Sequence, residues 1–293
     1  MRVFAFKYAY YNRIKCLRYA KEQGRIYTPM QKLKIFMNLS RSIDIPFLDL
    51  DVNTVCNLKC KKCAKCIPLK KGEVFSAQKV VSDLRLLLNY VDKIHVMSII
   101  GGEPFLNNDI DEVISFCSSC NQIIDIDITT NGTIIPKDKV FLALKDSRVV
   151  VHISDYRHID ERLIENRKKF IEKLEEYKIP YVFFSQEHEN WLDFGDIYNR
   201  SYNGFERGQV FYQCPLNSCT TYNDKKLYRC GRSSYLNQND VIETVMIDVS
   251  KIVSRREMRK KIHKFYSASY LKACNYCNKK PESIVPGIQI NNL

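Results

Sequence analysis

From residue 46 to residue 184 the chain alternates short apolar runs with helical segments, and this alternation limits the possible folds most strongly. Apolar runs of four to eight residues predict strands over residues 46–53, 94–100, 123–130, 149–154 and 181–184. Apolar residues at helical spacing predict helices over 77–91, 109–120, 137–144 and 160–177. Five such repeats indicate parallel strands joined by right-handed crossovers, either in a partial barrel or in an open sheet.

Cysteines follow the first predicted strand directly. In both architectures the active site forms at the carboxyl ends of the strands, so this loop is where function is expected. Cys56, Cys60 and Cys63 have the spacing CxxxCxxC, which can hold three corners of a 4Fe–4S cluster and leave one iron open. Cys66 adds an alternative, because four thiolates can also hold a structural zinc ion. Four unrelated buried cysteines are a third interpretation, which the polar loop does not favour.

Lysines surround these cysteines, at positions 59, 61 and 62. We expect them to lower the pKa values of the thiols and to offset the charge of a cluster. The 293 residues contain 12 cysteines but no apolar stretch of the ~20 residues that a membrane helix needs. Charged residues interrupt the N-terminal segment, so we expect no signal peptide and a cytoplasmic protein, in which cysteines favour metals over disulfides.

Two further motifs complete a family pattern. Residues 101–104 (GGEP) end the second predicted strand, and residues 129–133 (TTNGT) close the third. Together with CxxxCxxC after the first strand, they resemble the signature of the radical S-adenosylmethionine (SAM) superfamily. The resemblance spans residues 46–184 and implies an α/β fold, a partial (β/α)6 barrel of the radical SAM type.

The resemblance also implies cofactors and site residues. A 4Fe–4S cluster on Cys56, Cys60 and Cys63 would bind SAM through its open iron, and its reduction would yield a 5′-deoxyadenosyl radical that abstracts hydrogen from a substrate. The residues that would contact SAM are Gly101, Gly102, Glu103, Pro104, Thr130, Asn131 and Ser154, with Asp155 beside the last.

Some of these residues have simpler interpretations. Glu103 can be an acid at a helix N-terminus, Asn131 part of a turn, and Ser154 a helix cap. The sequence also departs from the family in one place. Lys62 replaces the aromatic residue that usually precedes the third cysteine, so contact with adenine must come from elsewhere.

A second cysteine group lies near the C-terminus. Cys214, Cys230, Cys274 and Cys277 resemble the ligands of an auxiliary 4Fe–4S cluster in a twitch or SPASM-like domain, with a hairpin strand over 225–231 delivering the second of them. Cys219 is a fifth candidate that could replace Cys214. Zinc is the alternative metal, because CxxC pairs suit it equally.

Three parts of the chain follow from these patterns. Residues 1–42 are expected to form a basic helical extension that packs on the main domain or, alternatively, lies on a membrane surface. Residues 43–205 would form the barrel. Residues 206–293 would form the auxiliary iron–sulfur module, with a basic helix around residues 255–264 and no clear period over 186–213.

The net charge of +13 bears on partners. A flavodoxin or ferredoxin-type electron donor would be attracted to such a surface, while a plain solvated basic face needs no partner. The substrate is expected to be a small molecule or a peptide, and no nucleic acid is expected.

The sequence favours a radical SAM oxidoreductase or epimerase that acts on a sugar, cyclitol or polyol. In an epimerisation a cysteine would return hydrogen to the substrate, and Cys219 or Cys66 is the candidate donor. The alternatives are a radical SAM modifier of a ribosomal peptide and, from another class, a zinc-stapled basic nucleic-acid-binding protein.

Overall fold

A single curved sheet organises the molecule. The computed structural model describes residues 42–154, 156, 159–183, 191–217 and 219–290. The expected N-terminal helix lies outside these ranges apart from residue 42, and Asp155 lies outside them as well. Eight strands form the main sheet in the order β5-β4-β3-β2-β1-β7-β8-β9, and β6 pairs with β10 in a separate two-stranded sheet.

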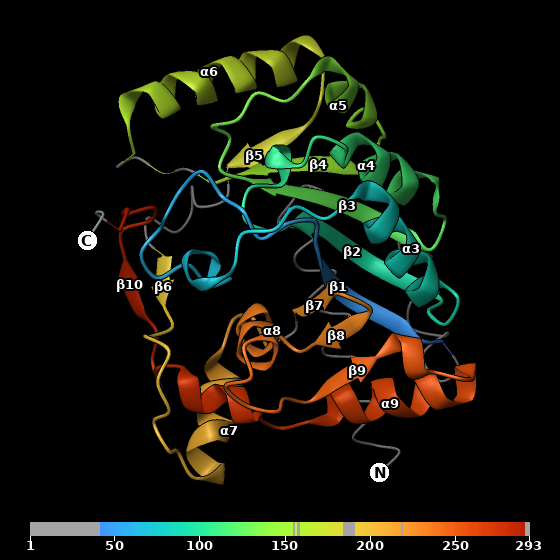
Figure 1. Ribbon diagram of the computed structural model, residues 1–293, viewed down its shortest axis with the longest axis vertical. Helices are drawn as coiled ribbons and strands as arrows, with labels where there is room; N and C mark the ends of the chain where they lie inside the picture. Colours follow the sequence, from blue (N-terminus) through green and yellow to red (C-terminus); the bar gives the residue numbers. More distant parts are fainter. Residues whose placement is uncertain (1–41, 155, 157–158, 184–190, 218, 291–293) are drawn as a thin grey trace, which may run out of the picture.

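The predicted strand–helix alternation is confirmed. The strands of this part are β1 (Asp44–Asp51), β2 (Lys93–Ile100), β3 (Ile123–Thr130), β4 (Val149–Ile153) and β5 (Tyr181–Phe183). Each pairs in parallel with the next. The helices are α3 (Ala77–Leu88), α4 (Ile110–Ser119), α5 (Asp138–Ala143) and α6 (Glu161–Glu176), which cover the outer face of the sheet (Figure 1).

Amphipathic spacing explains this packing. On α3, for example, Val80, Leu84 and Leu87 fall on one face and are almost fully buried against the sheet. The strands are apolar along most of their length because a parallel sheet that is covered by helices is buried on both faces. Polar residues are also buried within the sheet, where His152 of β4 lies 3.4 Å from Asp127 of β3, and others lie at the carboxyl ends of the strands.

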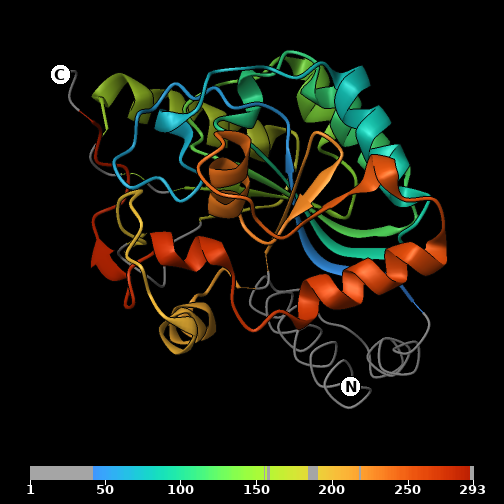
Figure 2. The same ribbon diagram turned by 60° about the horizontal axis from the view of Figure 1, so that its bottom comes forward.

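A sixth parallel strand comes from the C-terminal part of the chain. β7 (Thr220–Asn223) pairs in parallel with β1, on the opposite side from β2. β8 (Lys226–Tyr228) and β9 (Met246–Asp248) then continue the sheet antiparallel, as the orange strands beside blue β1 show (Figure 2). The partial barrel therefore holds five strands of the βα series and one strand from the segment that we expected to form a separate module.

Five further helices and strands complete the described structure. They are β6 (Trp191–Asp193), α7 (Gly204–Gln213), α8 (Gly231–Gln238), α9 (Arg255–Ser267) and β10 (Glu282–Ile284). Residues of α7 and α8 belong to a second, smaller core, whereas the buried residues of α9 belong to the main core. Short 3-10 helices lie at Ile67–Leu69, Pro104–Leu106, Val249–Lys251 and Lys272–Tyr276. Val210, Leu236 and Leu271 are buried together in this second core. Sequence periodicity did not indicate α7, because only one of its residues is buried.

The described helices give no support for a membrane span, since none of them combines enough length with enough apolar character.

Candidate active site

A cavity of about 640 Å³ lies at the carboxyl ends of the parallel strands. The thiols of Cys56, Cys60 and Cys63 line it, together with residues from the ends of β1, β2, β3 and β4. Cys66 is buried and does not line the cavity. The loop therefore turns three of its four cysteines toward one space, which is the donor set that a cluster with one open iron requires.

The glycines at the end of β2 allow the cysteine loop to approach. A Cβ atom at Gly101 would lie 2.5 Å from the carbonyl oxygen of Asn53, and one at Gly102 would lie 1.9 Å from that of Val55. The backbone N–H of Gly102 donates to Oδ1 of Asn53 at 2.9 Å, and that of Glu103 donates to the Val55 carbonyl at 2.8 Å. Glycine is needed here for close contact between two backbones.

Glu103 joins the ends of β2 and β3. Its carboxylate accepts hydrogen bonds from the Thr130 hydroxyl at 2.7 Å, from the Asn131 backbone N–H at 2.8 Å and from the Phe105 backbone N–H at 3.1 Å. The side chain is fully buried, and neither Glu103 nor Pro104 lines the cavity. Burial raises the pKa of Glu103 to about 7, although these hydrogen bonds oppose the shift.

Asn131 ties the end of β3 to the cysteine loop. Its Nδ2 donates to Oδ1 of Asn57 at 3.0 Å and lies 3.9 Å from the sulfur of Cys56. Asn57 in turn donates to the Thr133 hydroxyl at 2.8 Å. Thr130, Asn131 and Ser154 all line the cavity, as do Gly101 and Gly102. Five of the seven residues expected to contact SAM thus face the same space as the three thiols.

The prediction that lysines lower the thiol pKa values is wrong. Burial raises the pKa of Cys56 to about 12 and that of Cys60 to about 11. The only groups that oppose these shifts are hydrogen bonds, from the Leu58 backbone and from the Gln289 side chain. Metal ions deprotonate coordinating thiols, so a cluster bound here would supply the positive charge that the Cys56 and Cys60 thiolates lack.

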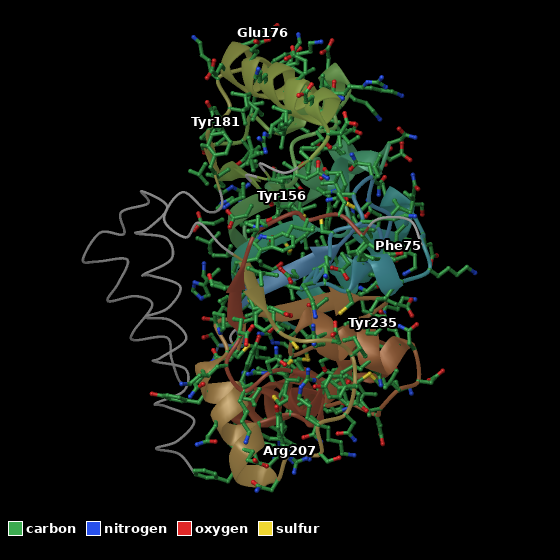
Figure 3. All side chains as sticks on the ribbon, turned by 90° about the vertical axis from the view of Figure 1, so that its left-hand side faces the viewer. Phe75, Tyr156, Glu176, Tyr181, Arg207 and Tyr235 are labelled. Atoms are coloured by element: carbon green, nitrogen blue, oxygen red, sulfur yellow. The ribbon has the colours of Figure 1, made fainter. Side chains whose placement is uncertain are left out.

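Lys62 is directed to the C-terminal part of the chain. Its ammonium pairs with Asp196 at 2.6 Å and with Asp193 at 3.4 Å. The aromatic wall of the cavity comes instead from Tyr156 and Trp191, whose rings meet edge to face with centroids 5.2 Å apart. In the side view Tyr156 lies over the green ribbons of the sheet (Figure 3). The sequence offered one signal for this wall, because Trp191 is the only tryptophan in the chain.

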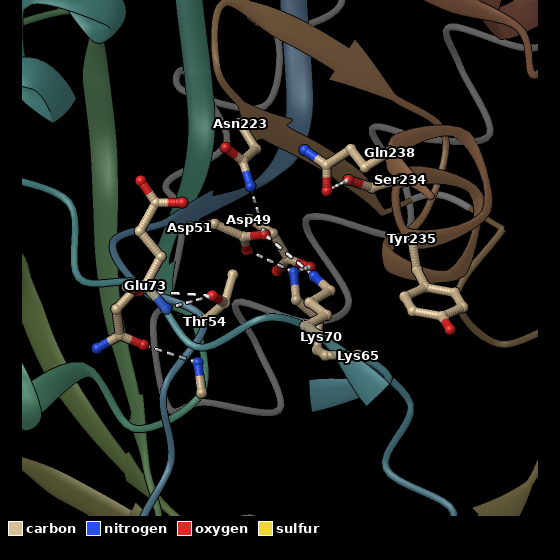
Figure 4. Close-up of polar contacts among 12 residues, drawn as sticks. Asp49, Asp51, Thr54, Lys65, Lys70, Glu73, Asn223, Ser234, Tyr235 and Gln238 are labelled. Atoms are coloured by element: carbon tan, nitrogen blue, oxygen red, sulfur yellow. Dashed lines mark hydrogen bonds and ion pairs between the residues drawn. The ribbon is translucent and has the colours of Figure 1, made fainter. Parts of the chain in front are cut away.

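A cluster of four charged residues, the charged wall (Asp49, Asp51, Lys65 and Lys70), contributes two side chains to the lining of the cavity. The ammonium of Lys65 contacts Asp51 at 2.7 Å and Asp49 at 3.2 Å, and Lys70 lies 4.0 Å from Asp51 (Figure 4). Burial opposes the charge of Lys65, but the two aspartates outweigh it and raise its pKa. Burial also raises the pKa of Asp49. Of these four, Asp49 and Lys65 line the cavity.

The C-terminal cysteines lie close enough together to interact electrostatically. Burial raises the pKa of Cys274, and the neighbouring thiols Cys230, Cys277 and Cys214 raise it further. Cys219 differs from them because it lines the cavity. Cys230 follows β8 and caps α8, as the expected hairpin required. The arrangement is compatible with the expected set of four ligands, although Cys214 and Cys230 also raise the pKa of Cys219, which therefore lies near the same group.

Sequence reasoning missed the contact between the chain end and the cysteine loop. Residues 288–290 pair antiparallel with residues 59–61: the Lys61 N–H donates to the Ile288 carbonyl and the Ile290 N–H to the Lys59 carbonyl, both at 2.7 Å. The Gln289 side chain points at Cys60, with its Nε2 3.4 Å from the sulfur. No local pattern links positions that lie about 230 residues apart.

Replacing Gly102 tests the close approach of the loop. In Gly102→Ala the new methyl group would overlap the Val55 carbonyl, so the cysteine loop must move away from β2. We expect this variant to hold much less iron and sulfide than the wild type after anaerobic reconstitution. Gly208→Ala, whose methyl group would meet nothing within 4 Å, should match the wild type. Equal iron in both variants would contradict the argument.

Glu103 should make stability depend on pH. Its pKa is about 7 in the folded chain against an ordinary value of 4.5, so between these values the folded state retains a proton that the unfolded state has lost. The free energy of unfolding should therefore fall as pH rises through this window, by about 3 kcal/mol at most. Glu103→Gln should lack this component. Urea unfolding of the cluster-free chain between about pH 5 and pH 8 measures this pH-dependent part of the free energy of unfolding. The same pH dependence in the wild type and in Glu103→Gln would show that Glu103 is not its source.

Comparison with known proteins identifies the family. Residues 51–200 match the model of the radical SAM superfamily. GTP 3′,8-cyclase of Clostridium acetobutylicum is 36% identical over 97 residues, which cover 32% of this chain and 30% of the cyclase. The probable GTP 3′,8-cyclase of Methanococcus aeolicus is 32% identical over 161 residues, which cover 48% of this chain and 52% of that cyclase. The chain thus spans only about a third to a half of these relatives.

Solved structures show weaker similarity. The complex of BtrN with AdoMet and 2-DOIA has a TM-score of 0.43 at 14% identity, covering 79% of this chain and 92% of that one. The crystal structure of Streptococcus suis SuiB has a TM-score of 0.40 at 19% identity, covering 56% of this chain and 41% of the SuiB chain. Similarity at this level does not bear on function. The family match covers half of the chain and coincides with the strand ends that carry the three motifs: the protein belongs to the radical SAM superfamily.

Proposed function

We propose that this radical SAM enzyme removes hydrogen from a small polar substrate that is bound in the cavity at the strand ends. The observation that carries the proposal is the shared lining of that cavity. Three thiols, the glycines of β2, the Thr130–Asn131 segment and a charged wall all face one space of about 640 Å³. Cavities of this size suit small ligands.

Cys56, Cys60 and Cys63 would hold the 4Fe–4S cluster, and Gly101, Gly102, Thr130, Asn131 and Ser154 would contact SAM. Cluster and SAM together, when bound, supply a 5′-deoxyadenosyl radical that abstracts hydrogen. The chain's own residues bind SAM, orient it and shield it from water. Tyr156 and Trp191 provide the apolar surface for adenine that Lys62 does not. Glu103 does not line the cavity, but its carboxylate holds the Asn131 backbone in place.

The charged wall favours a substrate with hydroxyl or amino groups. Asp49 can accept a hydrogen bond from such a group, and Ser98 and Thr129 add hydroxyls on the neighbouring strands. These two hydroxyls lie 3.2 Å apart and face the same cavity. This pattern supports a sugar, cyclitol or polyol. For a dehydrogenation, Asp49 is placed to take the proton that leaves the substrate hydroxyl.

An epimerisation would require a hydrogen donor, and the geometry separates the two candidates. Cys219 lines the cavity, whereas Cys66 does not. Burial raises the pKa of Cys219 well above its ordinary value, which keeps the thiol protonated and its S–H bond available. We therefore propose Cys219 as the donor if the reaction is an epimerisation.

The C-terminal part would serve as the redox module of the enzyme. An auxiliary 4Fe–4S cluster on Cys214, Cys230, Cys274 and Cys277 would supply an electron acceptor for an oxidation. Burial raises the pKa values of Cys230 and Cys277, and the buried guanidinium of Arg232 partly opposes both shifts, which supports this set. The functional division at residue 205 stays a proposal, since β7 joins the main sheet. A flavodoxin or ferredoxin-type donor would deliver the first electron.

A second candidate function comes from the relatives named GTP 3′,8-cyclase. Their matched segments cover 32% and 48% of this chain, so these relatives support the cyclase activity here only as a proposal. A triphosphate carries several negative charges and needs cationic partners. Among the described residues that line the cavity, Lys65 is the one cation, and Asp49 and Asp51 already occupy it. The cavity therefore favours a polyol over GTP.

Removal of the three cluster cysteines tests the core of the proposal. The triple variant Cys56→Ala, Cys60→Ala, Cys63→Ala should form no 5′-deoxyadenosine from SAM with dithionite, because no open iron remains. Cys274→Ala with Cys277→Ala should retain this SAM cleavage. The matched control is Cys117→Ala with Cys120→Ala, which changes cysteines outside both groups. SAM cleavage by the triple variant, or zinc in place of iron in the wild type, would refute the assignment.

Direct comparison of substrates separates the two candidate functions. With reconstituted enzyme, SAM and dithionite, GTP should neither raise 5′-deoxyadenosine formation above the substrate-free level nor be converted to a cyclised product. Chromatography with mass detection measures both quantities. A cyclised guanosine product would establish the second candidate and overturn the argument from the charge of the cavity.

A further inference from the structure

The chain end returns to the cysteine loop along a defined path. β10 pairs with β6, and Gly287 then adopts φ +73°, where a Cβ atom would lie within 3.0 Å of the Tyr156 ring. Beyond this turn, residues 288–290 run antiparallel to residues 59–61 and form a short strap (residues 287–290) over the loop. The red C-terminal segment lies beside the cyan loop in Figure 1.

The amide of Gln289 is held at both ends. Its Oε1 accepts a hydrogen bond from the Lys59 backbone N–H at 2.7 Å, which assigns Nε2 as the atom that faces the sulfur of Cys60 at 3.4 Å. Nε2 also donates to the Gly287 carbonyl at 2.5 Å. The orientation is therefore fixed by the strap itself, and the donor is aimed at one of the three thiols that line the cavity.

We propose that Gln289 is a positioning residue that donates an N–H···S hydrogen bond to the Cys60 thiolate and thereby raises the reduction potential of the cluster on Cys56, Cys60 and Cys63. The inference rests on the proposed assignment of Cys60 as a cluster ligand. Hydrogen bonds to cluster sulfurs favour the reduced, more negative state, and their loss lowers the potential.

The strap also explains why one glutamine can act selectively. Gln289 pairs with Cys60, whereas the sulfur of Cys56 receives contacts from Leu58 and Asn131. Ile288 and Ile290 flank Gln289 on the same strap, and their side chains are about 40% exposed. A change at either isoleucine alters the strap without touching the thiolate.

Potentiometric titration of the reconstituted full-length protein tests the inference. The cluster with the open iron is identified by the EPR signal that changes when SAM is added, and its midpoint potential is compared among variants of equal iron content. Gln289→Leu removes the donor and should shift the potential to a more negative value. Gln289→Glu should shift it further in the same direction. Ile290→Ala, the control on the strap, should leave it at the wild-type value.

Gln289→Lys separates the hydrogen bond from a purely structural role. A lysine keeps a donor and adds positive charge, so the potential should stay at or above the wild-type value. The inference is overturned if Gln289→Leu and Gln289→Lys shift the midpoint potential by the same amount. It is also overturned if Gln289→Leu holds a full cluster and has the wild-type potential. If Gln289→Leu prevents cluster binding, Gln289→Lys and Gln289→Glu still test the inference, because only Gln289→Glu should shift the midpoint potential to a more negative value. Absence of any SAM-responsive signal in the wild type would instead refute the proposed function.

Discussion

The site depends on close backbone contact between the cysteine loop and the end of β2. At Gly102 the two segments approach so closely that a single methyl group would overlap a carbonyl oxygen. Hydrogen bonds from the backbone N–H groups of Gly102 and Glu103 to Asn53 and Val55 hold them together. Because β3 is joined to the same place through Glu103, three strand ends form one rigid frame. The three thiols are presented on this frame.

Burial then determines the chemistry that the frame supports. Desolvation raises the pKa values of Cys56, Cys60 and Glu103 together, which makes the site a poor place for uncompensated negative charge. A bound metal cluster would compensate the charge of the thiolates, and three hydrogen bonds partly offset the burial of the Glu103 carboxylate. The charged wall follows the same rule: Lys65 is buried only together with Asp49 and Asp51. Among the described residues, the lining of the cavity is mostly apolar, and its two charged side chains, Lys65 and Asp49, are paired with each other.

The C-terminal part of the chain contributes to the frame in two ways. β7 extends the sheet beside β1, and residues 288–290 return to the cysteine loop. The C-terminal part of the chain is therefore in direct contact with the cysteine loop. Lys62 reinforces this link through Asp193 and Asp196. A lysine in a position where the family usually has an aromatic residue thus has a structural explanation.

Local sequence was enough for the parallel strands, the helices that cover them and the cluster motif, because periodicity and cysteine spacing depend on neighbouring residues. It also placed the GGEP and TTN segments at strand ends. It could not show that Glu103 turns away from the cavity, that Cys219 enters it while Cys66 does not, or that Gln289 faces Cys60. Those outcomes depend on contacts between segments that are distant in the chain. The sequence by itself therefore determined the fold class and the cofactor motif, and only the tertiary structure decided which side chains face the reacting space.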